Sequence, residues 1–248
     1  MPSTMTSQKV DPSNTTTCEF CGKTLMMRYV ENPFTSGGVV NLGFQECGCA
    51  QATAKRLAKQ ADEAIREQAA AQDALARKLQ ASGIPKRYLA KGHPDAERLT
   101  NNICNGVGFY LDGKQGTGKT TLAMAVARLC VERKLKVRVE IAPNLMEDMR
   151  SRKVENRERT HELATCDVLI LDDLGKEAPT AYACERLFQV INDRYNEELP
   201  IVVTSNYSRG EIASRLTEGD VGKSIASRLV EMTTRVHFDG IDRRLSRG

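Results

Sequence analysis

The stretch GKQGTGKTT, residues 113–121, decides the fold of this chain. It fits the pattern G-x-x-x-x-G-K-[ST], with Gly113, Gly118, Lys119 and Thr120 at the fixed positions. Glycines let successive backbone N–H groups point into one concavity that holds phosphate oxygens. The lysine brings a cation to the β- and γ-phosphates, and the hydroxyl after it ligates Mg²⁺. The stretch therefore predicts a P-loop that binds a nucleoside triphosphate with Mg²⁺.

The flanking sequence supports this interpretation over a chance glycine-rich turn. GVGFYL (residues 106–111) predicts a buried strand entering the loop, and residues 120–134 predict a helix leaving it. The positive end of that helix dipole would add to phosphate binding. The residues expected to contact the nucleotide are Gly113, Gln115, Gly116, Thr117, Gly118, Lys119, Thr120, Thr121 and Asp172.

Further apolar segments alternate with helical patterns along the rest of the chain. Strands are predicted for KVRVEIA (136–142), DVLILDD (167–173), PIVVTSN (200–206) and RVHF (235–238). Strands that alternate with helices indicate an α/β fold with a parallel sheet and helices on both faces.

Two adjacent acids end the strand over residues 167–173. Asp172 is expected to hold the Mg²⁺ shell together with Thr120, and Asp173 to polarise the attacking water as a general base. Two acids after an apolar strand could instead begin a turn. Asn206 ends the next strand, where its side chain could orient the same water or contact the γ-phosphate, although asparagine also favours turns.

The N-terminal region contains two closely spaced cysteine pairs, Cys18-x-x-Cys21 and Cys47-x-Cys49. Four thiolates in two such pairs suit tetrahedral structural zinc. Short strands around Gly37-Gly38 would give a zinc-ribbon-like hairpin between the pairs, and metal would supply much of its stability. A disulfide and a redox C-x-x-C are the alternatives, but a redox motif would not need the second pair.

The segments before and after the cysteine pairs differ from them in composition. Residues 1–17 are rich in Ser, Thr, Pro and Asn without periodicity and predict a disordered tail. Residues 51–83 are Ala-rich with mixed charge and predict a helical linker, either a solvated connector or a helix that docks a partner. The predicted domains are the tail (1–17), a zinc-binding module (18–50), the linker (51–83) and an ATPase domain (84–248). Four other cysteines are expected to pack as small hydrophobes: Cys104, Cys130, Cys166 and Cys184.

Composition limits the cell compartment and the partners. The chain has 248 residues, 40% of them hydrophobic, and a net charge of +4 that permits nucleic acid as a partner without arguing for it. It shows no secretory signal and no apolar run of membrane-spanning length, so we expect a cytoplasmic protein with reduced or metal-bound cysteines.

Seven motifs in a fixed order resemble the DnaC/IstB family of AAA+ ATPases, which comprises replicative helicase loaders and transposition ATPases. The resemblance covers about residues 82–245. The motifs are SGIPKRY (82–88), GKQGTGKTTLA (113–123), LILDDLG (169–175), NDRYN (192–196), VVTSN (202–206), ASRL (226–229) and FDGIDRR (238–244).

The resemblance implies an AAA+ sheet, Asn206 as a sensor of the γ-phosphate, and Arg228 as an arginine finger that reaches a neighbouring subunit's nucleotide. Few residues follow Phe238, so no C-terminal lid domain is expected. The cysteine module favours the loader branch of the family. The expected function is then ATP-dependent loading of a hexameric, DnaB-type replicative helicase onto single-stranded DNA by an ATP-dependent homo-oligomer. A transposition regulator acting on duplex DNA and a nucleotide-gated adaptor with negligible hydrolysis remain the rivals.

Overall fold

The computed structural model describes residues 9–32, 38–150, 154–176, 179–216 and 219–240. The chain divides into two compact units, Met1–Gln72 and Asp73–Gly248, and each is described by itself. Helix α1 (Ala50–Ala81) runs through the division, in agreement with the helix predicted for the linker.

The first unit contains a small antiparallel sheet of order β1-β2-β3, from β1 (Lys9–Thr17), β2 (Thr24–Glu31) and β3 (Val39–Phe44). The strands β2 and β3 match the predicted hairpin between the cysteine pairs. The sequence predicts disorder for residues 9–17, whereas the structure places them in β1; residues 1–8 lie outside the described residues. Since β1 is exposed along nearly its whole length, backbone pairing with β2 forms it without an apolar pattern.

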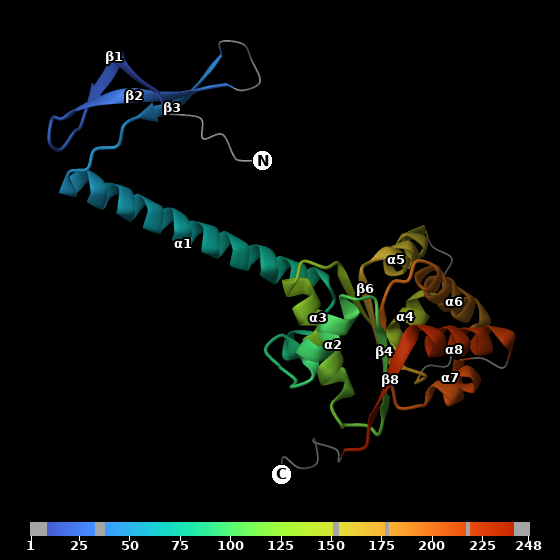
Figure 1. The fold of residues 1–248 in the computed structure, drawn as a ribbon. Coiled ribbons are helices and arrows are strands. Elements are labelled where there is room, and N and C mark those ends of the chain that lie inside the picture. Colours follow the sequence, from blue (N-terminus) through green and yellow to red (C-terminus); the bar gives the residue numbers. More distant parts are fainter. Residues whose placement is uncertain (1–8, 33–37, 151–153, 177–178, 217–218, 241–248) are drawn as a thin grey trace. The chain divides into compact units, whose positions relative to one another are not determined.

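The second unit is built on a five-stranded parallel sheet of order β5-β6-β7-β4-β8 (Figure 1). Every strand predicted for this region is present. Their bounds are β4 (Gly108–Gly113), β5 (Val137–Ile141), β6 (Val168–Leu174), β7 (Ile201–Ser205) and β8 (Thr233–Phe238).

Helices cover both faces of this sheet, as predicted (Figure 1). On one face lie α2 (Ala96–Ile103) and α3 (Lys119–Glu132), preceded by the short 3-10 helix η1 (Lys86–Tyr88). The opposite face carries α4 (Ala142–Asp148), α5 (Val154–Thr165), α6 (Ala181–Asn196), α7 (Arg209–Leu216) and α8 (Asp220–Met232).

Alternation along the strands divides the buried side chains between two cores. On β6, Leu169 and Leu171 pack toward α4–α8, whereas Val168 and Ile170 pack toward α2 and α3. Because both faces are covered, the three central strands β6, β7 and β4 are buried almost continuously, as is typical of parallel sheets. The carboxyl ends of these strands therefore share one edge, where the P-loop follows β4.

Of the four scattered cysteines, Cys130, Cys166 and Cys184 are buried, as predicted, but Cys104 is exposed. Cys104 follows directly after α2, and its sulfur accepts a hydrogen bond from Arg133 at 3.6 Å. Within the described residues, no helix combines the length and apolar character that crossing a bilayer requires.

Candidate nucleotide and metal sites

The P-loop joins the carboxyl end of β4 to the first turn of α3. Gly113 and Gly118 have φ angles of 129° and 109°, in the region that glycine adopts without strain. A Cβ on Gly113 would lie 2.2 Å from the Phe238 carbonyl oxygen. Gly118 is the N-cap of α3 and no side chain caps the helix, so the first-turn N–H groups are available to an anion.

Lys119 is the first residue of α3, directly after the loop, and is 5% exposed. Its Nζ donates to the carbonyl oxygens of Gly113 and Lys114, both at 2.7 Å, and to Asn206 Oδ1 at 3.1 Å. Burial lowers the pKa of Lys119 from its ordinary value, while Asp173 acts in the opposite direction. A buried cation held mainly by carbonyl dipoles is suited to an added anion such as a phosphate.

Thr120 and Asp172 converge beside the loop. The Thr120 hydroxyl donates to Asp172 Oδ1 at 2.9 Å, and the Thr204 hydroxyl donates to the same oxygen at 2.6 Å. Burial raises the pKa of Asp172, which the Thr204 hydrogen bond opposes. A hydroxyl and a carboxylate oxygen in contact at the mouth of a phosphate-binding loop are the hard oxygen donors that Mg²⁺ prefers. These residues therefore fit the predicted Mg²⁺ site.

Asp173 has a left-handed backbone conformation, with φ of 64°. Its amide donates to Thr204 Oγ1 at 2.9 Å, and its carboxylate pairs with Lys176 Nζ at 2.8 Å. The register between β6 and β7 shifts at this point, between Leu171 and Leu174. The two adjacent acids thus have different partners: Asp172 is bonded to Thr120, whereas the half-buried Asp173 pairs with Lys176. The sequence patterns did not predict these contacts of Thr204 and Lys176.

A second missed group, the Asp112 cluster, connects β4 to β8: Asp112, Arg235, His237 and Asp239. Asp112 is 1% exposed; it pairs with Arg235 Nη2 at 2.7 Å and with His237 Nδ1 at 2.7 Å. His237 Nε2 lies 2.6 Å from Asp239 Oδ1, and the Asp112 bond raises the pKa of His237. Asp112 directly precedes Gly113, the first residue of the P-loop. The cluster therefore holds β8 beside the start of the P-loop. The sequence feature that could have indicated this cluster is Asp112 itself, an acid at the end of an apolar strand directly before the P-loop.

The four N-terminal cysteines come together as the spacing predicts. All four sulfurs lie within 4.8 Å of one another, with 3.8 Å between Cys18 and Cys49 and 3.4 Å between Cys21 and Cys47. Zinc bound to four thiolates at about 2.3 Å places the sulfurs about 3.8 Å apart. Backbone N–H groups of Phe20 and Cys21 lower the pKa of Cys18 to about 6. The cluster therefore fits a structural zinc ion.

A protein-family model described as "IstB-like ATP binding protein" matches residues 99–247, which is more than half of the chain. This chain belongs to the IstB-like ATP-binding family. The match takes in the P-loop, both acids, Asn206 and Arg228, so the geometry above is that of an ATP-binding protein of this family.

The known proteins that this chain resembles include helicase loaders and an insertion-sequence protein. The replicative helicase loader DnaI of Bacillus subtilis is 24% identical, over 92% of this chain and 78% of its own length. A putative ATP-binding protein in an insertion sequence of Mycobacterium tuberculosis is 27% identical over 54% of the chain. The helicase loader DnaC of Escherichia coli is 25% identical over 52%. The chain spans about half the length of the last two proteins.

Solved structures agree with this fold. A crystal structure of DnaI superposes with a TM-score of 0.55 at 25% identity, covering 62% of this chain and 94% of that one. A crystal structure of the DnaC helicase loader superposes with a TM-score of 0.52 over 62% of this chain and all of that one. At 24% identity the second likeness supports the fold alone.

The structure of this IstB-like chain places Arg228 away from its own P-loop. Arg228 lies in the last turns of α8, which leads into the amino end of β8, whereas the P-loop follows the carboxyl end of β4. Its guanidinium carbon is 4.2 Å from the centroid of the Tyr195 ring. The structure thus groups Lys119, Thr120, Asp172, Asp173 and Asn206 and leaves Arg228 at the opposite edge of the sheet.

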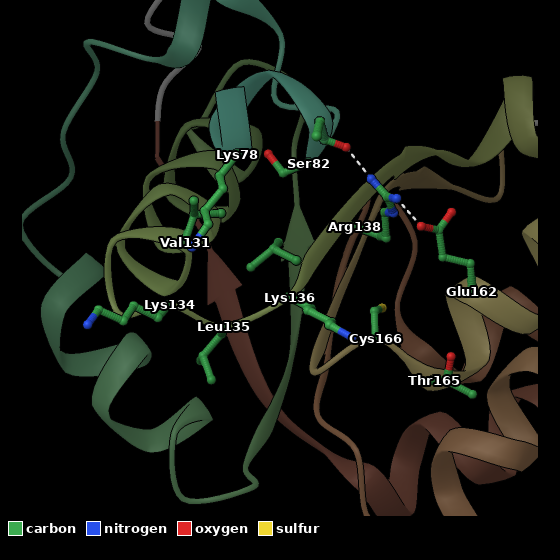
Figure 2. A pocket seen from close by; sticks show the side chains of 12 residues that line it. Lys78, Ser82, Val131, Lys134, Leu135, Lys136, Arg138, Glu162, Thr165 and Cys166 are labelled. Atoms are coloured by element: carbon green, nitrogen blue, oxygen red, sulfur yellow. Dashed lines mark hydrogen bonds and ion pairs between the residues drawn. The ribbon is translucent and has the colours of Figure 1, made fainter. Parts of the chain in front are cut away.

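A cavity of about 480 Å³ lies at the amino end of β5, apart from the P-loop residues. Figure 2 shows Arg138 between the end of α1 and Glu162 of α5. It donates to the Ala81 carbonyl oxygen and pairs with Glu162, while the Val139 amide donates to Ser82 at 2.8 Å. These contacts hold the end of α1 to β5. The cavity lies beside them and is separate from the nucleotide site.

Proposed function

We propose that this chain is an ATP-dependent loader that delivers a hexameric, DnaB-type replicative helicase to single-stranded DNA in the cytoplasm. One observation carries this proposal. The alignment with the DnaI helicase loader leaves less than a tenth of the chain unmatched, so it takes in most of the region that precedes the family match. That region contains the cysteine cluster, which the ATPase fold does not require.

The chemistry proposed for the ATPase domain follows from the arrangement at the P-loop. Backbone N–H groups and Lys119 bind the phosphates of ATP, and Thr120 and Asp172 would hold Mg²⁺, which neutralises charge on the β- and γ-phosphates. Asp173 accepts a proton from the attacking water. Asn206 contacts the γ-phosphate, since its side chain lies within hydrogen-bond distance of the Lys119 ammonium group. These roles, and the domain limits at residues 18–50, 51–83 and 84–248, are proposals.

The helicase-docking surface is proposed on the zinc-binding module. The strand β3 exposes four apolar side chains to at least 37%: Val39, Val40, Leu42 and Phe44. An exposed apolar surface of this kind marks a contact site for another protein. Zinc would stabilise the module that presents it, since its small core consists of few residues and includes the cysteines themselves.

A transposition regulator that acts on duplex DNA is a second candidate. It is supported by the insertion-sequence relative, which is 27% identical over 137 residues. It leaves the N-terminal cysteine cluster without a role, however, because that alignment covers only 54% of the chain.

Affinity capture from the native lysate tests the proposal. The tagged full chain, with and without ATP, should recover a DnaB-type helicase. Cys21→Ser should lose that partner while it keeps ATP binding, and the matched Cys104→Ser variant should keep both. Recovery of a transposase without a helicase would refute the loader function and support the second candidate.

A further inference from the structure

The side chain of Arg228 is stacked on an aromatic ring from another helix. Tyr195 lies in the last turn of α6, and its ring centroid is 4.2 Å from the guanidinium carbon of Arg228 on α8. A planar guanidinium that stacks on a ring keeps its N–H groups directed outward in its own plane. The stack therefore fixes the position of the Arg228 guanidinium relative to the Tyr195 ring.

One carboxylate fixes the ring in this place. The Tyr195 hydroxyl donates to Glu231 Oε2 at 2.6 Å, and the Ser227 hydroxyl donates to Glu231 Oε1 at 3.3 Å. Ser227 and Glu231 flank Arg228 on the same helix, α8. The ring is thus held by the helix that carries the arginine, so that Tyr195, Glu231 and Arg228 form one small unit.

This unit lies at the edge of the sheet opposite to its own P-loop. The helix α6 ends before β7 begins and α8 ends where β8 begins, so Tyr195 and Arg228 lie near the amino ends of the strands. The P-loop follows the carboxyl end of β4. An interaction of Arg228 with a nucleotide therefore requires the nucleotide of another chain.

We propose that Tyr195 is a positioning residue that holds Arg228 in the orientation with which it enters the ATP site of a neighbouring subunit. The inference rests on the proposed function, together with the trans role of Arg228 that the family resemblance implies. A long, unconstrained side chain loses rotamer freedom when it is fixed at an interface. Stacking on an anchored ring removes part of that freedom beforehand and holds the cation close to where the transition-state charge develops.

The first test compares ATP hydrolysis by single and double variants. Tyr195→Ala should lower kcat about fivefold or more, as expected for the loss of a cation–π contact, and leave KM for ATP unchanged. Tyr195→Phe keeps the ring and should recover much of kcat. Tyr195→Ala/Arg228→Ala should be no slower than Arg228→Ala alone, because Tyr195 acts through the arginine.

Tyr182→Ala is the matched control. It removes a comparable stack, on Arg186 at 5.1 Å, from the opposite end of the same helix, and should leave kcat unchanged. Thermal unfolding of each variant reports loss of folding separately from loss of kcat.

The second test asks which chain needs the tyrosine. In mixtures, an Arg228→Ala chain supplies the ATP site and a Lys119→Ala chain supplies the arginine. Adding Tyr195→Ala to the Lys119→Ala chain should reduce recovered hydrolysis, whereas adding it to the Arg228→Ala chain should not. If the mixture recovers no hydrolysis, the double-variant comparison decides.

Two results would overturn the inference: wild-type kcat in Tyr195→Ala, or a further loss when Tyr195→Ala is added to Arg228→Ala. If Arg228→Ala itself hydrolyses ATP at the wild-type rate, the trans role of Arg228 fails as well. Loss in Arg228→Ala together with wild-type kcat in Tyr195→Ala would refute the positioning role alone.

Discussion

The Lys119 Nζ lies 3.1 Å from Asn206 Oδ1, so the P-loop and the carboxyl end of β7 meet at one buried cation. The two residues are 87 positions apart in the chain, and the parallel sheet brings them together because β4 and β7 are neighbours. A γ-phosphate bound by Lys119 would therefore lie close to the Asn206 side chain at the end of β7.

Removal of the Lys119 cation should weaken nucleotide binding. Lys119→Ala should lower ATP affinity about tenfold to a hundredfold, which is the usual loss for a charge-assisted hydrogen bond, and should abolish hydrolysis. Titration calorimetry with ATP measures the affinity. Lys134→Ala removes a lysine that follows α3 outside the P-loop and should bind ATP normally. Wild-type affinity and turnover in Lys119→Ala would contradict the P-loop assignment.

The two adjacent acids should separate into two kinetic phenotypes. Asp172→Asn should raise the Mg²⁺ concentration needed for activity, because Asp172 is bonded to Thr120 at the proposed metal position. Asp173→Asn should bind ATP and Mg²⁺ almost normally but hydrolyse about 10²- to 10⁴-fold more slowly, as expected when a general base is lost. The two variants control for each other. The same rise in the Mg²⁺ concentration needed for activity in both variants would show that the acids act as one group.

The cysteine cluster should hold one zinc ion per chain. Elemental analysis of purified full-length protein should find one equivalent in the wild type and in Cys104→Ser, and less in Cys21→Ser. Chelation should raise hydrogen exchange in residues 18–49 and leave the ATPase domain protected, because the two regions have separate sources of stability. A module that contains no zinc and still resists exchange would refute the site.

The sequence predicted the ATPase strands and the P-loop because both depend on local patterns. An apolar strand, a glycine-rich loop and a helix follow one another between residues 106 and 134, and the structure places β4 and α3 there. The cysteine spacing likewise predicted the cluster, since two close pairs restrict where four sulfurs can lie. In contrast, β1 was missed because it is exposed along nearly its whole length and has no burial pattern to detect.

Contacts between distant segments account for most of the rest. Thr204 joins Asp172 only because β6 and β7 are neighbours in the sheet, and strand order cannot be read from apolar periodicity. Arg235 and His237 contact Asp112 across 123 and 125 residues for the same reason. The stacking of Arg228 on Tyr195 likewise depends on how α6 and α8 pack. These contacts depend on the order in which strands and helices pack. The motifs, in contrast, can be recognised from residue types and spacing alone.

The Asp112 cluster should make stability depend on pH. Both ring nitrogens of His237 contact carboxylates, Asp112 and Asp239, so the protonated imidazole is favoured and its pKa is raised in the folded state, although nearby Arg235 opposes this. A raised folded pKa gives stability that is fully present below the unfolded value of about 6.5 and is lost as pH rises through the folded value.

Denaturant unfolding of the full chain tests this dependence. The difference in unfolding free energy between wild type and His237→Gln should be larger near pH 5.5 than near pH 9. A difference for His237→Gln that is constant with pH would show that its contacts with the carboxylates do not depend on charge.

Arg228 should act on the ATP of a neighbouring subunit. Arg228→Ala should leave ATP binding by the isolated chain nearly intact, because Arg228 lies at the sheet edge opposite to its own P-loop. Hydrolysis by the assembled protein should fall sharply, since arginine fingers contribute about 10³ to 10⁵ in rate.

Mixing gives the sharper measurement of this trans contact. A Lys119→Ala chain binds ATP poorly but carries Arg228, and an Arg228→Ala chain binds ATP but lacks the arginine. Each is inactive alone, and together they should recover hydrolysis at interfaces where one supplies the site and the other the cation. Sedimentation of the mixture with ATP checks that the Lys119→Ala chain enters the assembly. Loss of hydrolysis in Arg228→Ala at a concentration where the wild type is active as a monomer would instead place Arg228 in its own subunit's site or in folding.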